Sequence, residues 1–495
     1  MRAVAWKLVK WTAGLALLGL VALLAVRAWD SQRGLPLALW HTYQPDDLTA
    51  AEIAKLDWAA YLKAEQALFD SVRANVTDKL PPEDRVGSNR YYDASPIYPG
   101  KFKTDWNRSY VLEPEGAPAG AVVLLHGLTD SPYSLRHVAR LYRERGYVAV
   151  AIRLPAHGTV PGALADVHWE DWSAATRLAV REARRRAGPG RPLHIVGFSN
   201  GGALAMLYAL DALGDPALAR PDRVVLISPM IGITELARFA GIFGWPAVLP
   251  RFARAAWLSI TPEFNPFKYN SFPINGARQS SLLTRALQPQ LARYARENRL
   301  GELPPILTFQ SVVDFTVSTR AIVTALYDQL PANGSELVLF DVNRNAIVSP
   351  LLRSSFYVAL DRLLPEPPRR YRTTVIANAG PQTGEVLERV VDAGSATERS
   401  RMLGLAYPRE VYSLSHVAVP FPVTDSLYGM APVNDEWFGV NLGTLTSRGE
   451  VGVLLLPLDS LIRMSSNPFA PYMMERIAEG IGRGGGAAAA ARPAK

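Results

Sequence analysis

The stretch "HIVGFSNGGALAMLYAL", from His194 to Leu210, begins as an apolar run, breaks at two glycines around a serine, and continues rich in alanine and leucine. The first part predicts a strand buried on both faces, and the last part predicts a helix. Ser199 therefore lies at a tight strand-to-helix turn, which pushes its side chain out at the carboxyl end of the sheet. Gly197 and Gly201 flank it because a Cβ at either position would collide with the neighbouring strand or helix.

Strands and helices alternate on both sides of this turn. Apolar runs that end in turn residues predict strands at 120–126, 147–154, 192–198 and 222–230, and amphipathic or apolar segments predict helices between them. This spacing requires crossover connections, so we expect an α/β fold with a mostly parallel sheet and helices on both faces. After residues 231–303, which are rich in aromatic residues and proline, strands resume at 304–314 and 335–343, followed by a strand-like run, "TTVIAN".

The composition excludes several classes of protein. The chain of 495 residues has no cysteine, which rules out disulfides, thiolate chemistry and cysteine-based zinc sites. No histidine pair has a convincing metal-ligand spacing, so we expect no metal site. The net charge of +8 comes without a recognisable nucleic-acid-reading module, so no nucleic-acid partner is expected.

The N-terminus has the features of a membrane segment. Arg2, Lys7 and Lys10 precede the uncharged apolar run from Trp11 to Val26. We expect a single-pass anchor in the inner membrane, with a cytoplasmic N-terminus and a periplasmic domain. The alternative is a secreted or periplasmic protein after signal cleavage. Against it stand the missing A-x-A-like site and an apolar core longer than that of a typical signal peptide.

The predicted organisation has six parts. The expected boundaries are an anchor (1–30), an N-terminal extension (31–115), the first half of the core (116–230), a cap insertion (231–303), the second half of the core with an insertion (304–440), and a C-terminal extension with a low-complexity tail (441–495). The sequence assigns no role to the two extensions.

Ser199 needs a base to act as a nucleophile, and histidine held by a carboxylate is the usual one. Asp314 follows the resumed strand "ILTFQS" at the same edge of the sheet, and His416 is the only histidine after it. We therefore predict a Ser199, Asp314, His416 series, with Asp341 as the alternative acid. Four other histidines are interpreted as structural: His126, His137, His157 and His194.

A developing negative charge beside Ser199 would need two backbone donors. The first N–H of the helix, that of Asn200, is one candidate. The loop "LLHGLTDSP" supplies the other, the N–H of Leu128, because Gly127 lets the backbone approach.

The segments "VVLLHGLTDSPYS", "AIRLPAHGTVPG", "IVGFSNGGALA", "SVVDFTV" and "SLSHV" resemble landmarks of the α/β-hydrolase superfamily, in its monoglyceride-lipase, lysophospholipase and serine-aminopeptidase branch. The resemblance implies an eight-stranded sheet, a cap between the sixth and seventh strands, and no cofactor. Ser199 would be the nucleophile, His416 the base and Asp314 its orienting acid. About a hundred residues separate Asp314 from His416, more than is usual in the family. Either a second insertion lies there, or the final strand is "VYSLS" rather than "LVLF".

We therefore expect a serine hydrolase that cleaves carboxylic esters, such as an esterase, a lipase or a lysophospholipase, through an acyl-enzyme. The substrate would be a small acyl ester or a lipid. An acyltransferase, or a catalytically silent scaffold of the same fold, is an alternative. So is an aminopeptidase, which would need acidic side chains of the cap to hold an ammonium group, and the candidates are Glu235, Glu263, Glu297 and Glu302.

Overall fold

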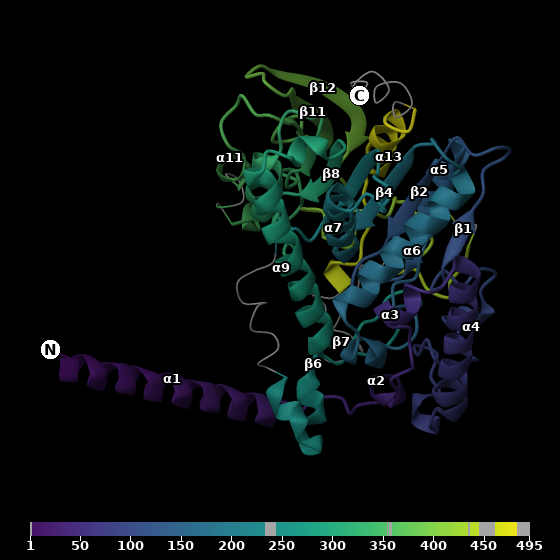
Figure 1. Ribbon diagram of the computed structural model, residues 1–495, viewed down its shortest axis with the longest axis vertical. Helices are drawn as coiled ribbons and strands as arrows, with labels where there is room; N and C mark the ends of the chain where they lie inside the picture. The colour runs from purple at the N-terminus through teal and green to yellow at the C-terminus, as the bar shows by residue number, and fades with distance from the viewer. Residues whose placement is uncertain are drawn as a thin grey trace.

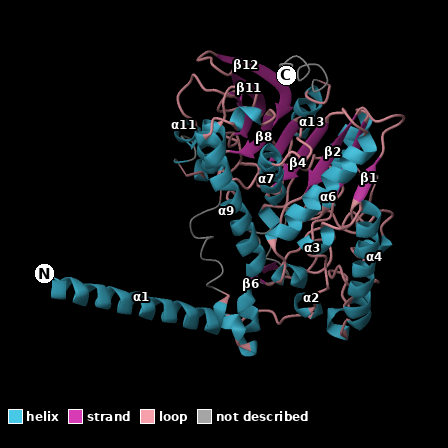
Figure 2. Cartoon of the chain, in the orientation of Figure 1, coloured by secondary structure: helices cyan, strands magenta, loops and turns pink. Residues whose placement is uncertain are grey.

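The computed structural model describes residues 2–232, 244–353, 355, 359–433, 436–444 and 461–482. Its centre is a ten-stranded sheet in the order β1-β3-β2-β4-β5-β8-β9-β10-β11-β12 (Figures 1 and 2). The strands are β1 (Tyr110–Leu112), β2 (Gly120–Leu125), β3 (Tyr147–Ala151), β4 (Leu193–Phe198), β5 (Arg223–Ile227), β8 (Ile306–Ser311), β9 (Glu336–Phe340), β10 (Arg372–Asn378), β11 (Glu385–Val391) and β12 (Glu398–Ala406).

The seven strands from β3 to β10 in this order are mutually parallel. At the edges, β1 pairs antiparallel with β3, β11 with β10, and β12 with β11. Every residue of β2, β3, β4, β8 and β9 is buried, as expected for strands covered on both faces. The prediction of a mostly parallel sheet with helices on both faces is confirmed.

Two layers of helices enclose the sheet. On one face α6 (Trp169–Ala187), α7 (Asn200–Gly214) and α9 (Ile274–Arg296) bury their apolar side chains in the larger core. On the other face α5 (Arg136–Glu144) and α13 (Ala470–Glu479) pack in a second core. The described chain also has four short α-helices: α2 (Leu39–Thr42), α3 (Ala50–Ile53), α10 (Thr319–Ala321) and α11 (Ala359–Leu363).

The segment between β5 and β8 differs from the family expectation. In the described sheet it lies between the fifth and sixth strands in chain order, not the sixth and seventh, because only β1 precedes β2. We call its described residues 244–303 the cap segment. It contains the 3-10 helices η7 (Trp245–Val248) and η8 (Pro250–Ala256), the two-stranded sheet of β6 (Trp257–Ser259) and β7 (Phe272–Pro273), and α9.

The distance in sequence between Asp314 and His416 is explained by added strands. β10 extends the parallel sheet beside β9, and β11 and β12 follow as an antiparallel hairpin. The sheet thus has ten strands where the resemblance implied eight. Residues 411–415 form no strand, so the alternative that placed the final strand at "VYSLS" is wrong.

The N-terminal extension is tied to the core by a buried arginine. α4 (Trp58–Asn75) carries Glu65, whose Oε1 lies 3.1 Å from Nε of Arg153, and Asp47 lies 2.8 Å from the same guanidinium. The Arg153 side chain, just after β3, has no exposed surface. Removing either carboxylate would leave part of a buried charge without a partner, so the extension is an integral part of the fold.

The first helix, α1 (Arg2–Asp30), extends away from the rest of the molecule (Figure 1). Its residues Val9–Asp30 are long and apolar enough to cross a membrane, and the rest of the molecule does not bury them. Membrane anchors and signal sequences share this length and composition.

Candidate active site

The turn between β4 and α7 holds Ser199 in a conformation that few side chains adopt. Its φ is 54° and its ψ is −116°, and it immediately precedes the first residue of α7. A Cβ on Gly197 would lie 2.3 Å from the carbonyl oxygen of Gly201, and a Cβ on Gly201 would lie 2.0 Å from that of Leu125. Both positions therefore admit only glycine, and the strained turn is maintained by close backbone packing.

The structure brings Ser199, His416 and Asp314 together from three separate parts of the chain. Oγ of Ser199 lies 2.9 Å from Nε2 of His416, and Nδ1 of His416 lies 2.8 Å from Oδ2 of Asp314. With the Nδ1–H donating to the carboxylate, Nε2 is left to accept the hydroxyl proton. This is the geometry that nucleophilic catalysis by a serine requires.

Asp314 lies in a loop that holds its carboxylate ionised. Oδ1 accepts hydrogen bonds from the N–H groups of Thr316, at 2.7 Å, and Val317, at 3.0 Å. Burial alone would raise the pKa of Asp314, but the facing His416 and these N–H groups outweigh it, so the pKa lies below its usual value. Nε2 of Gln310 adds a third donor, 3.2 Å from Oδ2.

His416 is held from two sides. Its ring stacks on Phe198 with 5.4 Å between ring centroids, and the residue is 4% exposed. The hydroxyl of Ser415 donates to the carbonyl of Arg463 at 2.7 Å, and the Arg463 guanidinium donates to Oγ1 of Thr316 at 2.7 Å. The C-terminal segment therefore links the loop of His416 to the loop of Asp314.

Asp341, the alternative acid, follows β9 and has other partners than His416. Its carboxylate accepts from the N–H of Val342 at 2.9 Å and lies 3.5 Å from Arg344. In the part of the chain that the structure describes, it makes no hydrogen bond to His416, whose Nδ1 is taken by Asp314.

The two backbone N–H groups of Leu128 and Asn200 are available for a ligand. Neither donates to any acceptor among the described residues. A Cβ on Gly127 would lie 3.2 Å from Cβ of Ser199, so the loop of Leu128 runs close beside the serine. Two free donors next to a nucleophile can stabilise the oxyanion of a tetrahedral intermediate.

His126 and His157 support this loop. Nε2 of His126 accepts from the N–H of Leu154 at 3.0 Å, and its Nδ1 bonds the carbonyl of Gly127 at 2.9 Å. Burial, helped by the neighbouring His157, lowers the pKa of His126 well below its usual value, so its ring is neutral. His157 lies against its ring and bonds the carbonyl of Pro155 at 2.9 Å.

Two charged residues near the site were missed by the sequence analysis. Asp130 follows the Leu128 loop and interacts electrostatically with His416 and with Lys268 of the cap segment. The N–H of Tyr269 donates to the carbonyl of Thr129 at 2.8 Å, which joins the two segments. Burial raises the pKa of Asp130 and lowers that of Lys268, and each charge opposes the other's shift. No sequence motif marks Lys268, because its position depends on how the cap segment folds.

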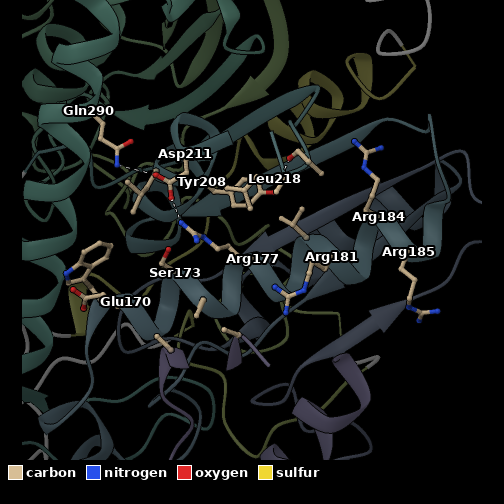
Figure 3. A pocket seen from close by; sticks show the side chains of 18 of the residues that line it. Glu170, Ser173, Arg177, Arg181, Arg184, Arg185, Tyr208, Asp211, Leu218 and Gln290 are labelled. Atoms are coloured by element: carbon tan, nitrogen blue, oxygen red, sulfur yellow. Dashed lines mark hydrogen bonds and ion pairs between the residues drawn. The ribbon is translucent and has the colours of Figure 1, made fainter. Parts of the chain in front are cut away.

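The site has no features of a metal centre. Over the described residues, no three His, Asp or Glu side chains are grouped so that they could hold an ion. A cavity of about 910 Å³ lies along α6 and α7, and none of its lining residues belongs to the triad (Figure 3). Within it, Arg177 and Gln290 both bond Asp211, at 2.8 and 3.2 Å, so this carboxylate is already partnered.

Comparison with known proteins places the core in a family. The model of the family described as "Serine aminopeptidase, S33", a group of hydrolases, matches residues 116–342. Residues 116–342 have the α/β-hydrolase fold, and this match supports the serine-aminopeptidase and monoglyceride-lipase branch. The resemblance inferred from the sequence motifs is thus confirmed.

A curated relative is the thermostable monoacylglycerol lipase of Bacillus sp. (strain H-257). It is 31% identical over 134 residues, which are 26% of this chain and 52% of the relative. The chain therefore spans about half the length of this relative.

The solved structures that resemble the chain are more distant. A metagenome-derived lipolytic enzyme is 20% identical, over 48% of this chain and 88% of that one, with a TM-score of 0.38. A monoacylglycerol lipase from Paleococcus ferrophilus is 16% identical, over 47% and 87%, with a TM-score of 0.35. At these scores the solved structures add nothing to the family match.

Proposed function

We propose that the protein is a serine hydrolase that cleaves carboxylic esters through an acyl-enzyme. The observation that carries the proposal is the continuous chain of contacts from Oγ of Ser199 through His416 to Asp314. The free N–H groups of Leu128 and Asn200 beside the serine support it.

In the first half-reaction, Oγ of Ser199 attacks the ester carbonyl and Nε2 of His416 takes the hydroxyl proton. The N–H groups of Leu128 and Asn200 hold the resulting oxyanion, and the ionised Asp314 stabilises the imidazolium. His416 then gives its proton to the leaving alkoxide, which departs as an alcohol. In the second half-reaction His416 activates a water that attacks the acyl-enzyme and releases the acid. An acyltransferase would differ only in using an alcohol in place of this water.

The acidic groups of the cap segment favour an ester over a peptide N-terminus as substrate. The buried Glu263 already accepts from the N–H groups of Asn270 and Ser271, at 3.1 and 2.8 Å. Glu302 bonds Arg299 at 2.6 Å, and Glu297 lies 3.9 Å from Arg293. Both follow the C-terminal end of α9, whereas it is the opposite end of the helix, at Gly276, that lies near Leu128. Glu235 lies outside the described residues. Lys268 of the cap segment precedes Tyr269, whose N–H bonds the carbonyl of Thr129, and its positive charge would repel a substrate ammonium.

A lipid ester is the substrate class that best fits the rest of the chain. The curated relative is a monoacylglycerol lipase, and α1 would hold the domain at a bilayer. We propose that α1 is an uncleaved span of the inner membrane, with its basic N-terminus in the cytoplasm and the hydrolase domain in the periplasm. A catalytically silent scaffold would need neither of the two contacts that join Ser199, His416 and Asp314.

Hydrolysis assays with matched variants test the proposal. The full chain in detergent should release p-nitrophenol from short- and long-chain p-nitrophenyl esters. Ser199→Ala and His416→Ala should each lose at least three orders of magnitude in kcat, because each residue forms bonds in the reaction. Hydrolysis of aminoacyl amides without ester hydrolysis would support the aminopeptidase instead. Equal activity of wild type and Ser199→Ala would contradict both enzymes.

A further inference from the structure

The end of α1 is joined to the cap segment by hydrogen bonds. The guanidinium of Arg27 donates to the carbonyl of Trp257, and Nε2 of Gln32 donates to that of Arg251 at 2.9 Å. In the other direction, Nη1 of Arg254 donates to the carbonyl of Gly34 at 3.3 Å. These bonds fix η8 and β6 beside the last turn of α1, where Figure 1 shows the helix meeting the body of the molecule.

The length of α1 sets where this junction would lie in a membrane. The 22 residues Val9–Asp30 span about 33 Å as a helix, close to the thickness of the hydrocarbon core. If Val9 lies at one interface, Trp29 and Asp30 lie at the other. The guanidinium of Arg33 stands 3.5 Å from the ring of Trp29, a pair suited to the headgroup region. The parts of the cap segment that touch this turn are therefore at the same depth.

The cap segment presents apolar side chains to solvent at this junction. Val248 is 84% exposed, and Leu249 and Trp245 are more than half exposed. We call the exposed apolar residues of the junction the cap patch: Trp29, Leu35, Trp245, Val248, Leu249 and Leu258. Exposed apolar side chains gathered beside a membrane span are typical of a lipid-binding surface.

The cations around the cap patch fit an anionic lipid surface. Arg33 and Arg251 are both exposed there, and neither is ion-paired to a carboxylate within the described residues. Basic side chains at the end of a membrane span attract anionic headgroups. The positive charge, the exposed apolar side chains and the continuity with α1 all favour an anionic lipid surface as the partner of the cap patch.

We propose that the cap patch inserts into the anionic leaflet of the membrane that α1 spans, so that anchor and cap form one docking surface. The inference rests on the proposed retention of α1 and not on the proposed chemistry.

Docking would also position the nucleophile. β6 pairs with β7, and α9 begins directly after β7. Along α9, Oγ of Ser280 donates to Oδ1 of Asn200 at 3.0 Å, and a Cβ on Gly276 would lie 3.9 Å from Leu128. The segment that contacts lipid thus continues into the helix that contacts the turn of Ser199, which favours esters presented at the bilayer surface.

Single-cysteine labelling tests the inference, because the chain has no cysteine of its own. Val248→Cys carries a nitroxide label in the full chain, reconstituted in vesicles of phosphatidylcholine with phosphatidylglycerol. Met402→Cys is the control: it is 50% exposed and lies on β12, at the opposite end of the molecule from α1. We expect the label at 248 to collide more with oxygen than with a water-soluble nickel chelate, and the label at 402 to show the reverse.

Three other results would overturn the inference. Equal access of the nickel chelate at both positions would place the cap patch in water. Protection of position 248 from both reagents would indicate a protein partner. Equal insertion into vesicles of phosphatidylcholine alone would remove the role of the arginines. Because this readout needs no turnover, it separates the failure of docking from the failure of the proposed activity.

A kinetic experiment adds a second measure. Trp245→Gln combined with Val248→Gln changes only exposed side chains, so folding should be retained. Hydrolysis of a long-chain monoacylglycerol in the anionic vesicles should fall about tenfold, a change of about 1.4 kcal/mol. Hydrolysis of p-nitrophenyl acetate should stay at the wild-type rate. Equal losses on both substrates would contradict a role in docking.

Discussion

The residues of the proposed triad, Ser199, His416 and Asp314, could be predicted from patterns in the sequence itself. Ser199 follows from its glycines, and His416 from being the only histidine after Asp314. The donors that support them could not be predicted, since Gln310 and Arg463 reach the site only through the tertiary fold. The same holds for Lys268, which comes from the cap segment. A sequence rule can identify a group that reacts, but rarely the groups that hold it in place.

The choice between Asp314 and Asp341 as orienting acid is tested by two substitutions. Asp314→Asn removes the negative charge that faces Nδ1 of His416, so kcat for a p-nitrophenyl ester should fall about 10³–10⁴-fold. KM should change little. Asp341→Asn is the matched control, and its kcat should stay within a few-fold of wild type. The reverse ranking of the two variants would assign the acid to Asp341.

Among the elements, strands with continuous apolar runs could be predicted and those at the polar edge could not. β2, β3 and β4 are buried along their whole length and read as apolar in the sequence. β12 has no buried residue and carries Glu398, Arg399 and Arg401, so its sequence does not read as a strand. Charged side chains on an edge strand oppose pairing with other chains. A strand with such side chains has no alternating hydrophobic pattern by which it could be predicted. Apolar residues recur at helical spacing over residues 46–76, but the chain forms two helices there, because Asp57 caps α4 separately from α3.

The glycines of the β4–α7 turn give a prediction at this scale. Gly201→Ala would place its Cβ 2.0 Å from the carbonyl oxygen of Leu125, so either β2 or α7 must shift. We expect a loss of about 3 kcal/mol or more in the free energy of unfolding, with loss of ester hydrolysis. Gly482→Ala, whose Cβ would meet nothing within 4 Å, should leave both unchanged. Chemical unfolding and activity assays measure the two effects, and a wild-type-like Gly201→Ala would refute the close packing.

The whole molecule is held together by buried ion pairs between distant segments. Asp425, which follows His416 in the chain, lies 2.7 Å from Arg136 of α5 and 2.9 Å from His137, and the Asp425 and Arg136 side chains are at most 1% exposed. Arg153 likewise joins the N-terminal extension to the core through its buried ion pairs with Asp47 and Glu65. These pairs could not be predicted from the sequence, because partners 88 to 289 residues apart leave no local pattern.

The pair of Asp425 and Arg136 predicts a large effect on stability. Asp425→Asn leaves the buried Arg136 with Glu436, at 3.6 Å, as its one remaining carboxylate among the described residues, so the free energy of unfolding should fall by about 3 kcal/mol. The control is Glu297→Gln, which breaks an exposed pair and should cost less than about 0.5 kcal/mol. Urea unfolding of the full chain in detergent measures both. Equal midpoints for the two variants would contradict the assigned importance of the buried pair.

The same pair predicts how stability depends on pH. Burial alone would raise the pKa of Asp425, but Arg136 and His137 more than offset it and hold the pKa far below its usual value of 3.8. The stability that Asp425 contributes is therefore full at neutral pH and is lost as the pH falls from 3.8 towards the folded value. The difference in unfolding free energy between wild type and Asp425→Asn should shrink below about pH 4. A constant difference down to pH 2 would contradict the lowered pKa.

The measurement that tests the central claim most directly is covalent labelling of the full chain with a fluorophosphonate, followed by peptide mass spectrometry. An activated serine reacts with this probe and an ordinary hydroxyl does not. We predict one adduct, on the peptide that contains Ser199, absent from Ser199→Ala and strongly reduced in His416→Ala. An adduct on another residue, or equal labelling of wild type and His416→Ala, would contradict the account.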